Sequence, residues 1–379
     1  MKPTILILEV LPDIKGGQQM LLEFIPALTE YDLHAVVPES GALSEALQAL
    51  GVTCHQVPMQ QYALMHKGAR DVFAFASELG RLTRQVAAIA RACRAQLLWA
   101  NSSRAFVWGT LAAMRTGIPS VWYAQNLLVD RKSLWLTRVL AHARAVRTIV
   151  GASEPTILQY GQMNKSRVIP VAVDTALYRP SPENRTAIRA ALGIPEDRLV
   201  VASVGDLIPL KGQSLLLEAA RATPAVCYWV IGDARPDQPD SVAYAKDLTA
   251  RATDNVRFFG RRTDVAELLS AADVLAITST LETGPRVLAE ALACGLPVIS
   301  TRVGIAPKVI VPNENGYLVE SDPGEIAATL TRWAADASAR RRMAQAARET
   351  AVRELDTHTF RQRILSVVQQ NVGQRPKRP

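Results

Sequence analysis

The chain has 379 residues, of which 49% are hydrophobic, and a formal net charge of +8. This length predicts two domains. No run of about 20 apolar residues occurs, and the start MKPTILILEVLP lacks a signal-peptide cleavage pattern, so we expect a cytoplasmic protein without a membrane span. Four scattered cysteines and five histidines show no disulfide or zinc-site spacing, and no metal site is expected.

Positive charge is concentrated between residues 51 and 150, which have a local excess of +10, whereas residues 1–50 are acidic. Arg81, Arg84, Arg91 and Arg94 recur there at helical spacing among apolar residues. Through its basic residues, the segment 66–147 could lie on an anionic membrane surface, on the cytoplasmic face of the inner membrane, or bind a charged acceptor. A solvated helix face is the alternative. No nucleic-acid-binding pattern is present.

The first half alternates short apolar runs with segments of helical period, which indicates a parallel sheet with crossover helices. Helices are predicted from Gln18 to Leu28 and from Ser77 to Arg94. The expected strands are residues 4–10, 34–38, 52–58, 96–100, 120–124 and 146–152.

A stretch with three prolines, residues 167–185, then interrupts the alternation and is predicted to be a linker. The alternation restarts after it, and from about Pro323 to Gln370 the period is helical. The expected strands of this half are residues 198–205, 226–232, 255–260, 273–279, 297–301 and 316–320.

The expected fold is therefore α/β, with two Rossmann-like, doubly wound parallel-sheet domains facing a cleft, followed by C-terminal helices. The first domain is assigned to residues 1–170, with helix 357–370 packing back on it, and the second to residues 171–356. The tail 371–379 is basic, proline-rich and predicted to be disordered. Ligands of such sheets bind beyond the carboxyl ends of the strands, and several glycines follow those strands, among them Gly16, Gly17, Gly205 and Gly232.

The segment ETGPRVLAE places Glu282 and Glu290 eight positions apart, too far out of phase to share one helix face. Pro285 suits the first position of a helix, so that the two acids would flank the helix N-terminus. Free N–H groups there favour a phosphate, and Arg286 in the first turn is consistent with a nearby anion. Carboxylates accept hydrogen bonds from vicinal diols, so the pattern suits a nucleotide sugar, and a solvated acidic loop is the alternative.

Two further loops could bind phosphate. In VGDLIPLKG, Lys211 follows a strand and could reach a pyrophosphate, although no Walker A motif is present. Gly16 and Gly17 follow the first strand and would let backbone approach a ligand closely, although a tight turn explains them equally well. No G-x-G-x-x-G motif occurs after either first strand, which argues against a nicotinamide oxidoreductase.

Together these segments resemble glycosyltransferase family 4, whose members have the two-domain GT-B fold. Glu282 and Glu290 match its E-x7-E motif, EALACGLPVIST its continuation, and VGDLIPLKG its G-x-L-x-x-x-K-G loop. The resemblance covers roughly residues 1–350 and is most specific in the second half. GIPSVWYAQN and VGASE provide a thinner match in the first half.

The resemblance implies a retaining, metal-independent hexosyltransferase that moves a sugar from a UDP- or GDP-sugar to an acceptor hydroxyl. No cofactor is implied, and the expected acceptor is a glycan or lipid-linked glycan of cell-surface polysaccharide, lipopolysaccharide or glycolipid synthesis. Glu282, Lys211 and Gln125 are the implied catalytic residues, with Lys211 neutralising the departing diphosphate. The implied donor-binding residues are Glu290, Gly205, Asp206, Gly284, Pro285, Arg286, Val287, Gly232, Gly16 and Gly17.

Several positions depart from the family pattern. Asp206 stands where an arginine is usual, which removes one cation near the implied phosphates. Gln125 replaces a histidine and cannot take a proton, and Asn126 replaces an aspartate. Lys308 replaces a glutamate. These departures leave open a weakened or non-catalytic nucleotide-sugar-binding protein, and a nucleotide-sugar epimerase is a further alternative.

Overall fold

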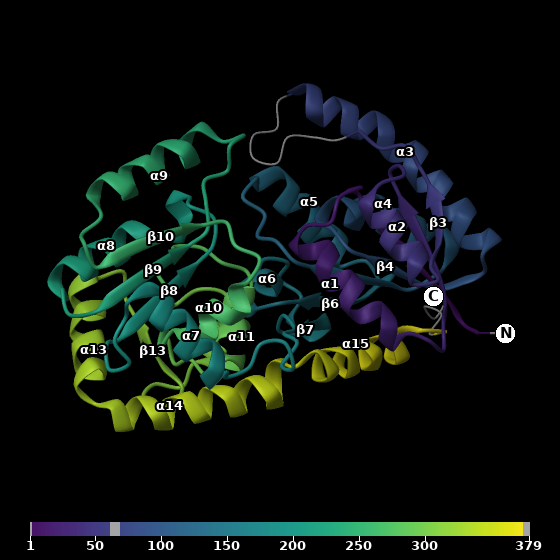
Figure 1. Cartoon of the computed structure of the whole chain (residues 1–379). Coiled ribbons are helices and arrows are strands. Elements are labelled where there is room, and N and C mark those ends of the chain that lie inside the picture. Colours follow the sequence, from purple (N-terminus) through teal and green to yellow (C-terminus); the bar gives the residue numbers. More distant parts are fainter. Residues whose placement is uncertain (1, 61–68, 374–379) are drawn as a thin grey trace. The chain divides into compact units, whose positions relative to one another are not determined.

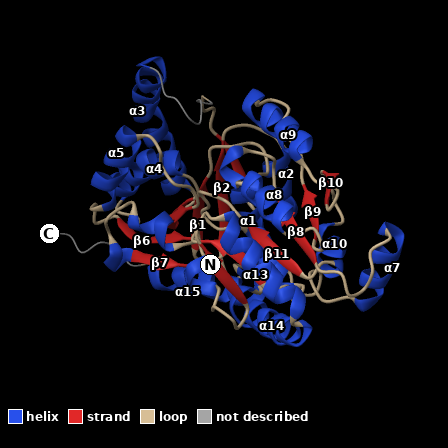
Figure 2. Cartoon of the chain, turned by 90° about the vertical axis from the view of Figure 1, so that its left-hand side faces the viewer, coloured by secondary structure: helices blue, strands red, loops and turns tan. Residues whose placement is uncertain are grey.

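The computed structural model describes residues 2–60 and 69–373, which form two compact α/β units (Figure 1). Unit 1 comprises the residues up to Pro170 together with those from Phe360 onward, and unit 2 runs from Val171 to Thr359. In each unit helices surround a central parallel sheet (Figure 2). The predicted α/β class with two doubly wound sheets is thus confirmed.

Unit 1 is built on a seven-stranded sheet of order β3-β2-β1-β4-β5-β6-β7. The order reverses between β1 and β4, which makes this strand pair the topological switch point. Strands buried on both faces need near-continuous apolar runs, and β1 and β5 are fully buried. The strands are β1 (Thr4–Leu8), β2 (Asp32–Val37), β3 (Thr53–Gln56), β4 (Ala95–Ala100), β5 (Ser120–Ala124), β6 (Val146–Gly151) and β7 (Ser166–Val168).

Aromatic side chains fill one layer of the unit 1 core. Phe106 stacks on Trp122 with ring centroids 4.5 Å apart, and Tyr160 meets both rings edge-on. Burial of each such side chain contributes roughly 1.5–3 kcal/mol. The helices of this unit are α1 (Gly16–Phe24), α2 (Ala42–Ala49), α3 (Ala69–Ala92), α4 (Ser103–Thr116), α5 (Arg131–Ala141), α6 (Glu154–Leu158) and α15 (Thr357–Asn371).

The C-terminal helix α15 packs on unit 1. Arg361 donates from Nε to the carbonyl oxygen of Glu23 on α1 at 2.7 Å. Asn371 donates from Nδ2 to the Thr148 hydroxyl on β6 at 3.0 Å. Buried Phe360, Ile364 and Val368 form its apolar face.

Unit 2 has a six-stranded sheet of order β10-β9-β8-β11-β12-β13, with its switch point between β8 and β11. Its strands are β8 (Val200–Val204), β9 (Cys227–Ile231), β10 (Val256–Gly260), β11 (Val274–Ile277), β12 (Val298–Thr301) and β13 (Gly316–Val319). Its helices are α7 (Pro182–Leu192), α8 (Gln213–Ala222), α9 (Pro239–Arg251), α10 (Val265–Ala271), α11 (Arg286–Ala293), α12 (Ala306–Val309), α13 (Pro323–Ala335) and α14 (Ala337–Thr350).

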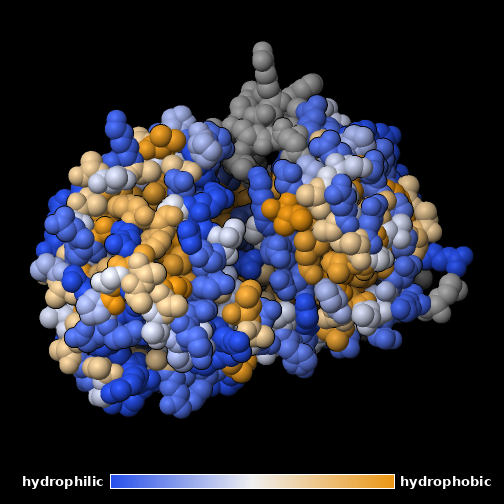
Figure 3. All heavy atoms as spheres, in the orientation of Figure 1, coloured by the Kyte–Doolittle hydropathy of each residue, from blue (hydrophilic) through white to orange (hydrophobic). Residues whose placement is uncertain are grey.

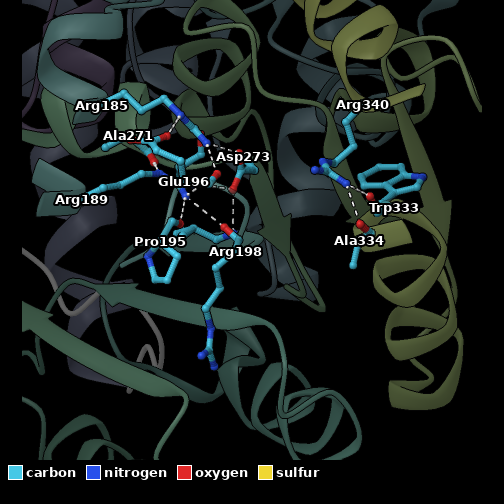
Figure 4. Close-up of polar contacts among 12 residues, drawn as sticks. Arg185, Arg189, Pro195, Glu196, Arg198, Ala271, Asp273, Trp333, Ala334 and Arg340 are labelled. Carbon is cyan, nitrogen blue, oxygen red and sulfur yellow. Dashed lines mark hydrogen bonds and ion pairs between the residues drawn. The ribbon is translucent and has the colours of Figure 1, made fainter. Parts of the chain in front are cut away.

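A buried arginine fastens α7 to this sheet. Arg189 is fully buried, and its Nη2 lies 2.5 Å from Oδ2 of Asp273, just before β11. The same oxygen accepts from the backbone N–H of Val200, the first residue of β8, at 2.8 Å. Arg189 also donates to the carbonyl oxygens of Pro195, Glu196, Arg198 and Ala271 (Figure 4). Because both charges are paired and hydrogen-bonded, the interior tolerates them at the amino ends of β8 and β11.

The two ends of unit 2 pair with each other. Val173 donates its backbone N–H to the carbonyl oxygen of Leu355, and Thr357 donates to the carbonyl oxygen of Val173. The Thr175 hydroxyl donates to Oδ2 of Asp356 at 2.6 Å. The chain therefore enters and leaves unit 2 at one place.

Some predicted elements were wrong in detail. The region expected to be a linker contains β7 and the start of α7; β7 escaped notice because it has only three residues before Pro170. The predicted helix from Gln18 to Leu28 begins two residues earlier and changes at Ile25 into a short 3₁₀ helix. The basic helix begins at Ala69, well before the expected Ser77.

No helix in the described ranges 2–60 and 69–373 is both long and apolar enough to cross a membrane. On the face drawn in Figure 3, hydrophobic residues are interspersed with hydrophilic ones. The predicted disordered tail lies mostly outside the described residues, because α15 extends to Asn371 and the description ends at residue 373.

Candidate functional site

Lys211 and Glu282 meet at the switch point of unit 2. Lys211 lies in the loop that follows β8, Glu282 in the loop that follows β11, and the Lys211 Nζ is 2.6 Å from Oε1 of Glu282. The Ser279 hydroxyl donates to the same carboxylate oxygen at 2.9 Å. The side chains are 26% and 13% exposed, so both remain partly open to solvent. Two residues predicted to act in one reaction are thus brought into direct contact.

Backbone hydrogen bonds fix these two loops to each other. The Thr280 N–H donates to the carbonyl oxygen of Leu210 at 2.9 Å, and the Thr278 hydroxyl donates to that of Lys211 at 3.1 Å. Gly212 has φ +64°, and a Cβ there would lie 2.1 Å from the carbonyl oxygen of Thr278. Only glycine fits this left-handed position so close to a neighbouring backbone, and the glycine therefore sets the place of the preceding lysine.

Glu290 lies in the second turn of α11 and is 13% exposed. Its Oε1 is 3.8 Å from Nε of Arg286. Burial raises the pKa of Glu290, while Arg286 and a hydrogen bond with Tyr178 oppose that shift. The Arg286 guanidinium therefore has an acidic neighbour within its own helix, and its contact with a ligand anion stays a prediction. Pro285 caps the helix and Arg286 is the first helical residue, one position later than predicted.

Asp206 is surrounded by arginines that the sequence did not single out. Its Oδ2 lies 2.7 Å from Nε of Arg235, in the loop after β9, and its Oδ1 lies 3.6 Å from Nη2 of Arg261, just after β10. Two guanidinium groups therefore face one carboxylate at the carboxyl ends of three neighbouring strands. Position 206 lacks the arginine that is usual in the related family, but Arg235 and Arg261 bring positive charge to the same edge of the sheet.

The remaining donor-binding predictions in unit 2 fall on loops at the same edge of the sheet. Gly232 follows β9 directly, and a Cβ there would lie 2.0 Å from the carbonyl oxygen of Gly205, so close packing of two strand ends accounts for this glycine. Gly284 lies in the loop before α11, and Val287 follows Arg286 in its first turn. Lys308 is exposed on the short helix α12.

The other predicted residues lie together in unit 1. Gln125, which follows β5, donates from Nε2 to the carbonyl oxygen of Gly17 at 3.2 Å and to Oδ1 of Asn101 at 3.1 Å. A Cβ on Gly17 would lie 1.9 Å from Oε1 of Gln125, so this glycine makes room for the glutamine. Gly16 is exposed, with no atom near its Cβ position.

Sequence reasoning missed five polar residues at these sites: Glu9, Asn101, Tyr178, Arg235 and Arg261. For two of them a signal existed, since Glu9 and Asn101 each interrupt an apolar run directly after a strand. Among the residues that the structure describes, no group of three or more histidine, cysteine, aspartate or glutamate side chains could hold a metal ion.

The chain is similar to known proteins in sequence. Residues 184–350 match the family Glycosyl transferases group 1. A D-inositol 3-phosphate glycosyltransferase of Segniliparus rotundus is 29% identical over 316 residues, which cover 76% of this chain and 67% of the relative. The protein of the same name from Mycolicibacterium smegmatis is 32% identical over 192 residues, 49% of this chain and 44% of the relative. The chain thus spans about half to two thirds of the length of these relatives.

Solved structures agree over nearly the whole chain. The crystal structure of Anabaena Alr3699/HepE in complex with UDP has a TM-score of 0.82 and 25% identity, covering 98% of this chain and 100% of that one. Sucrose-phosphate synthase from Thermosynechococcus elongatus has a TM-score of 0.77 at 19% identity, covering 97% and 99%.

The fold is therefore that of the GT-B glycosyltransferases. More narrowly, the stretch that matches glycosyl transferases group 1, residues 184–350, includes Lys211, Glu282 and all of α11. Both findings support a glycosyltransferase as the class of enzyme.

Proposed function

We propose that the chain is a retaining, metal-independent glycosyltransferase that transfers a hexose from a nucleotide sugar to the hydroxyl of a glycan or lipid-linked glycan. The observation that carries the proposal is the Lys211–Glu282 pair at the switch point of unit 2, where open α/β sheets bind ligands. UDP is the first nucleotide to test, because Anabaena Alr3699/HepE was crystallised in complex with UDP.

In this proposal unit 2 binds the donor. The Lys211 ammonium moves from Glu282 to the diphosphate and neutralises the charge that develops as it leaves. Glu282 is then free to accept hydrogen bonds from hydroxyls of the transferred sugar. Glu290 accepts from the ribose diol, and the free N–H groups at the start of α11 face the phosphates. The departing phosphate itself takes the proton of the acceptor hydroxyl, since Gln125 cannot.

The proposal is tested by thermal-shift measurements with UDP, GDP, ADP and their sugars, followed by assays of nucleotide release with and without EDTA. A nucleoside diphosphate that binds should raise the melting temperature. Release of free diphosphate should depend on an added acceptor and persist in EDTA. D-inositol 3-phosphate belongs in the acceptor panel, since two similar proteins carry that name. Binding without turnover would favour a nucleotide-sugar-binding protein, and sugar interconversion without an acceptor would favour an epimerase.

We also propose that unit 1 associates peripherally with an anionic membrane through α5. Trp135 and Val139, one turn apart on this helix, are 67% and 50% exposed, and Val129 just before it is 74% exposed. The exposed basic residues Arg131 and Lys132 lie in its first turn. An aromatic ring and aliphatic side chains beside cations suit the boundary between headgroups and acyl chains.

Two arginines of the predicted basic helix α3 have partners within unit 1. Arg81 is paired with Glu78 at 2.7 Å, and Arg91 donates to the carbonyl oxygen of Arg115. Flotation with vesicles of 30 mol% phosphatidylserine should recover the wild-type protein but little of a Trp135→Ser/Val139→Ser variant. Val242→Ser, which removes an equally exposed apolar side chain from α9, is the control. Equal flotation of all three proteins would exclude α5 as the membrane contact.

A further inference from the structure

Three polar side chains form a chain of hydrogen bonds across adjacent strand ends of unit 1. Glu9, Asn101 and Gln125 are the first residues after β1, β4 and β5, which are neighbours in the sheet. Asn101 donates from Nδ2 to Oε2 of Glu9 at 2.6 Å, and Gln125 donates from Nε2 to Oδ1 of Asn101 at 3.1 Å. The first of these bonds crosses the switch point between β1 and β4.

Glu9 is the terminal acceptor of this chain of hydrogen bonds, because donors face both of its carboxylate oxygens. It is fully buried, and the Val10 N–H donates to its Oε1 at 2.7 Å. Gln18 accepts the Lys15 N–H with its own oxygen, which turns its amide nitrogen toward Glu9. Burial raises the pKa of Glu9, and hydrogen bonds from Asn101, the Val10 N–H and Gln18 oppose that shift. As a carboxylate, Glu9 accepts with both oxygens, so the group that faces it from Asn101 is the NH₂, as the 2.6 Å contact from Nδ2 has it.

The orientation of Asn101 fixes which group of Gln125 must face it. With its NH₂ on Glu9, Asn101 can offer only Oδ1 to Gln125, and Gln125 must answer with its own NH₂. The carbonyl oxygen of Gly17 also accepts from that NH₂ at 3.2 Å and favours the same orientation. The side-chain oxygen of Gln125 then lies beside the Cα of Gly17. It accepts no hydrogen bond from residues 2–60 and 69–373. Gln125 is partly exposed.

We infer that Glu9 and Asn101 are positioning residues that fix the amide of Gln125 so that its oxygen accepts a hydrogen bond from a hydroxyl of the acceptor. The inference rests on the proposed function for the identity of the ligand. It explains how a glutamine can serve where the related family has histidine: the amide offers one defined acceptor without titrating. A ligand group that only accepts hydrogen bonds is disfavoured at this point.

Exchanging the two partners tests the polarity directly. In Glu9→Gln, the new amide has a single oxygen acceptor for two donors, the Val10 N–H and the Asn101 NH₂. Because the Val10 N–H is fixed in the backbone, we expect the oxygen to stay on it and the new NH₂ to face the NH₂ of Asn101. In Asn101→Asp, two acids face each other. In the double variant Glu9→Gln/Asn101→Asp, the new amide at position 9 donates to the new carboxylate at position 101, whose second oxygen still accepts from Gln125. The exchange therefore restores the wild-type orientation of Gln125, although it moves the acid from one strand end to the next.

The readout is the ratio of kcat/KM for the acceptor identified in the panel above and for its monodeoxy-fluoro analogues, in which fluorine cannot donate. For one substituted position, the wild type and the exchange variant should prefer the hydroxyl by roughly tenfold. Glu9→Gln and Gln125→Ala should lose most of that preference. Glu9→Gln should have no further effect on it in a Gln125→Ala background. An unchanged preference in Glu9→Gln, or an exchange variant that fails to restore it, would overturn the inference.

Thermal unfolding of the four proteins in the Glu9/Asn101 cycle separates this inference from the proposed function, because it needs no ligand. The exchange variant should be more stable than the sum of the single substitutions predicts. Additive effects would overturn the hydrogen-bond chain itself. If the wild type failed to bind any nucleotide sugar, the proposed function would fail while the coupling still reported on the chain. Restored stability without restored preference would refute the positioning role.

Discussion

The two ends of one strand pair in unit 2 use ion pairs in opposite ways. At the amino ends of β8 and β11, Arg189 is fully buried, and every nitrogen of its guanidinium is hydrogen-bonded to Asp273 or to backbone carbonyl oxygens. At the carboxyl ends, Lys211 meets Glu282 at 2.6 Å, but its side chain is 26% exposed. The two acids are similarly exposed, at 15% for Asp273 and 13% for Glu282, so the contrast lies in the cations. An ammonium group with three donors can exchange one partner for another, whereas a guanidinium held at every nitrogen cannot.

The same two strands can therefore hold a structural ion pair at one end and an ion pair available to a ligand at the other. The amino end fixes the helix and the strands, and the carboxyl end presents charges that a ligand can take over. A saturated buried pair serves stability, because removing one partner strands a charge. A partly exposed pair contributes little to stability and is available for chemistry.

The largest effect is expected for Arg189→Met. This change removes a fully buried guanidinium and leaves Asp273 and four carbonyl oxygens with one donor fewer, so it should lower the free energy of unfolding of unit 2 by about 3–5 kcal/mol. Arg185→Met is the matched control, because Arg185 pairs with the same carboxylate but is 27% exposed and should cost much less. Urea unfolding monitored by tryptophan fluorescence measures both. Equal losses would remove the distinction between saturated and open pairs.

Lys211→Ala should affect turnover and not stability, the opposite of Arg189→Met. We expect a stability close to wild type and a kcat lower by one to two orders of magnitude, or about 1.5–3 kcal/mol for one charge-assisted hydrogen bond in the transition state. Lys246→Ala, which removes an exposed lysine from α9, should behave like wild type in both assays. Near-normal turnover by the Lys211 variant would contradict its role at the diphosphate.

A third prediction concerns pH. Because burial raises the pKa of Glu290, its carboxylate gains a proton at a higher pH than an ordinary glutamate, and donor affinity should decline as pH falls through that raised pKa. Tyr178→Phe removes an opposing hydrogen bond and should shift this decline to still higher pH. Glu290→Gln should bind UDP more weakly and lack the decline. Calorimetric titration with UDP between pH 5 and 8 would show these shifts; identical profiles for all three proteins would exclude Glu290 as the titrating group.

The smallest effect is expected for Asp206→Asn. Its pairs with Arg235 and Arg261 are exposed, so the free energy of unfolding should change by less than about 1 kcal/mol. If these guanidinium groups supply the cation that position 206 lacks, the substitution frees them and should tighten UDP binding a few-fold while leaving uridine binding unchanged. Weaker UDP binding would mean that the aspartate holds the arginines in their useful positions.

Twelve strands of the two sheets were predicted from the sequence, most of them because buried parallel strands require continuous apolar runs. β7 was not predictable, since a three-residue strand carries no period. The short motifs around Lys211 and Glu282 located the candidate site of unit 2. The partners of Asp206 escaped because Arg235 and Arg261 follow other strands, and only strand order makes them neighbours.

The same reason applies to Glu9 and Asn101, which lie 92 positions apart in sequence yet share a hydrogen bond. Each is visible in the sequence as a polar residue directly after a strand, but neither indicates that the other is its partner. Their relation depends on β1 and β4 being adjacent, which follows from the reversal of strand order and not from any local pattern.

The paired ends of unit 2 carry a consequence for how this chain can be taken apart. The backbone of Val173 is hydrogen-bonded to Leu355 and Thr357, on both sides of Asp356. Unit 2 therefore has the topology of a domain inserted into unit 1, with its entry and exit segments paired. We expect that such a segment can be excised and expressed alone, and that its host can be closed by a linker between Pro170 and Phe360. Under the proposed function, the excised unit 2 would then be a separate reagent for binding nucleotide sugars.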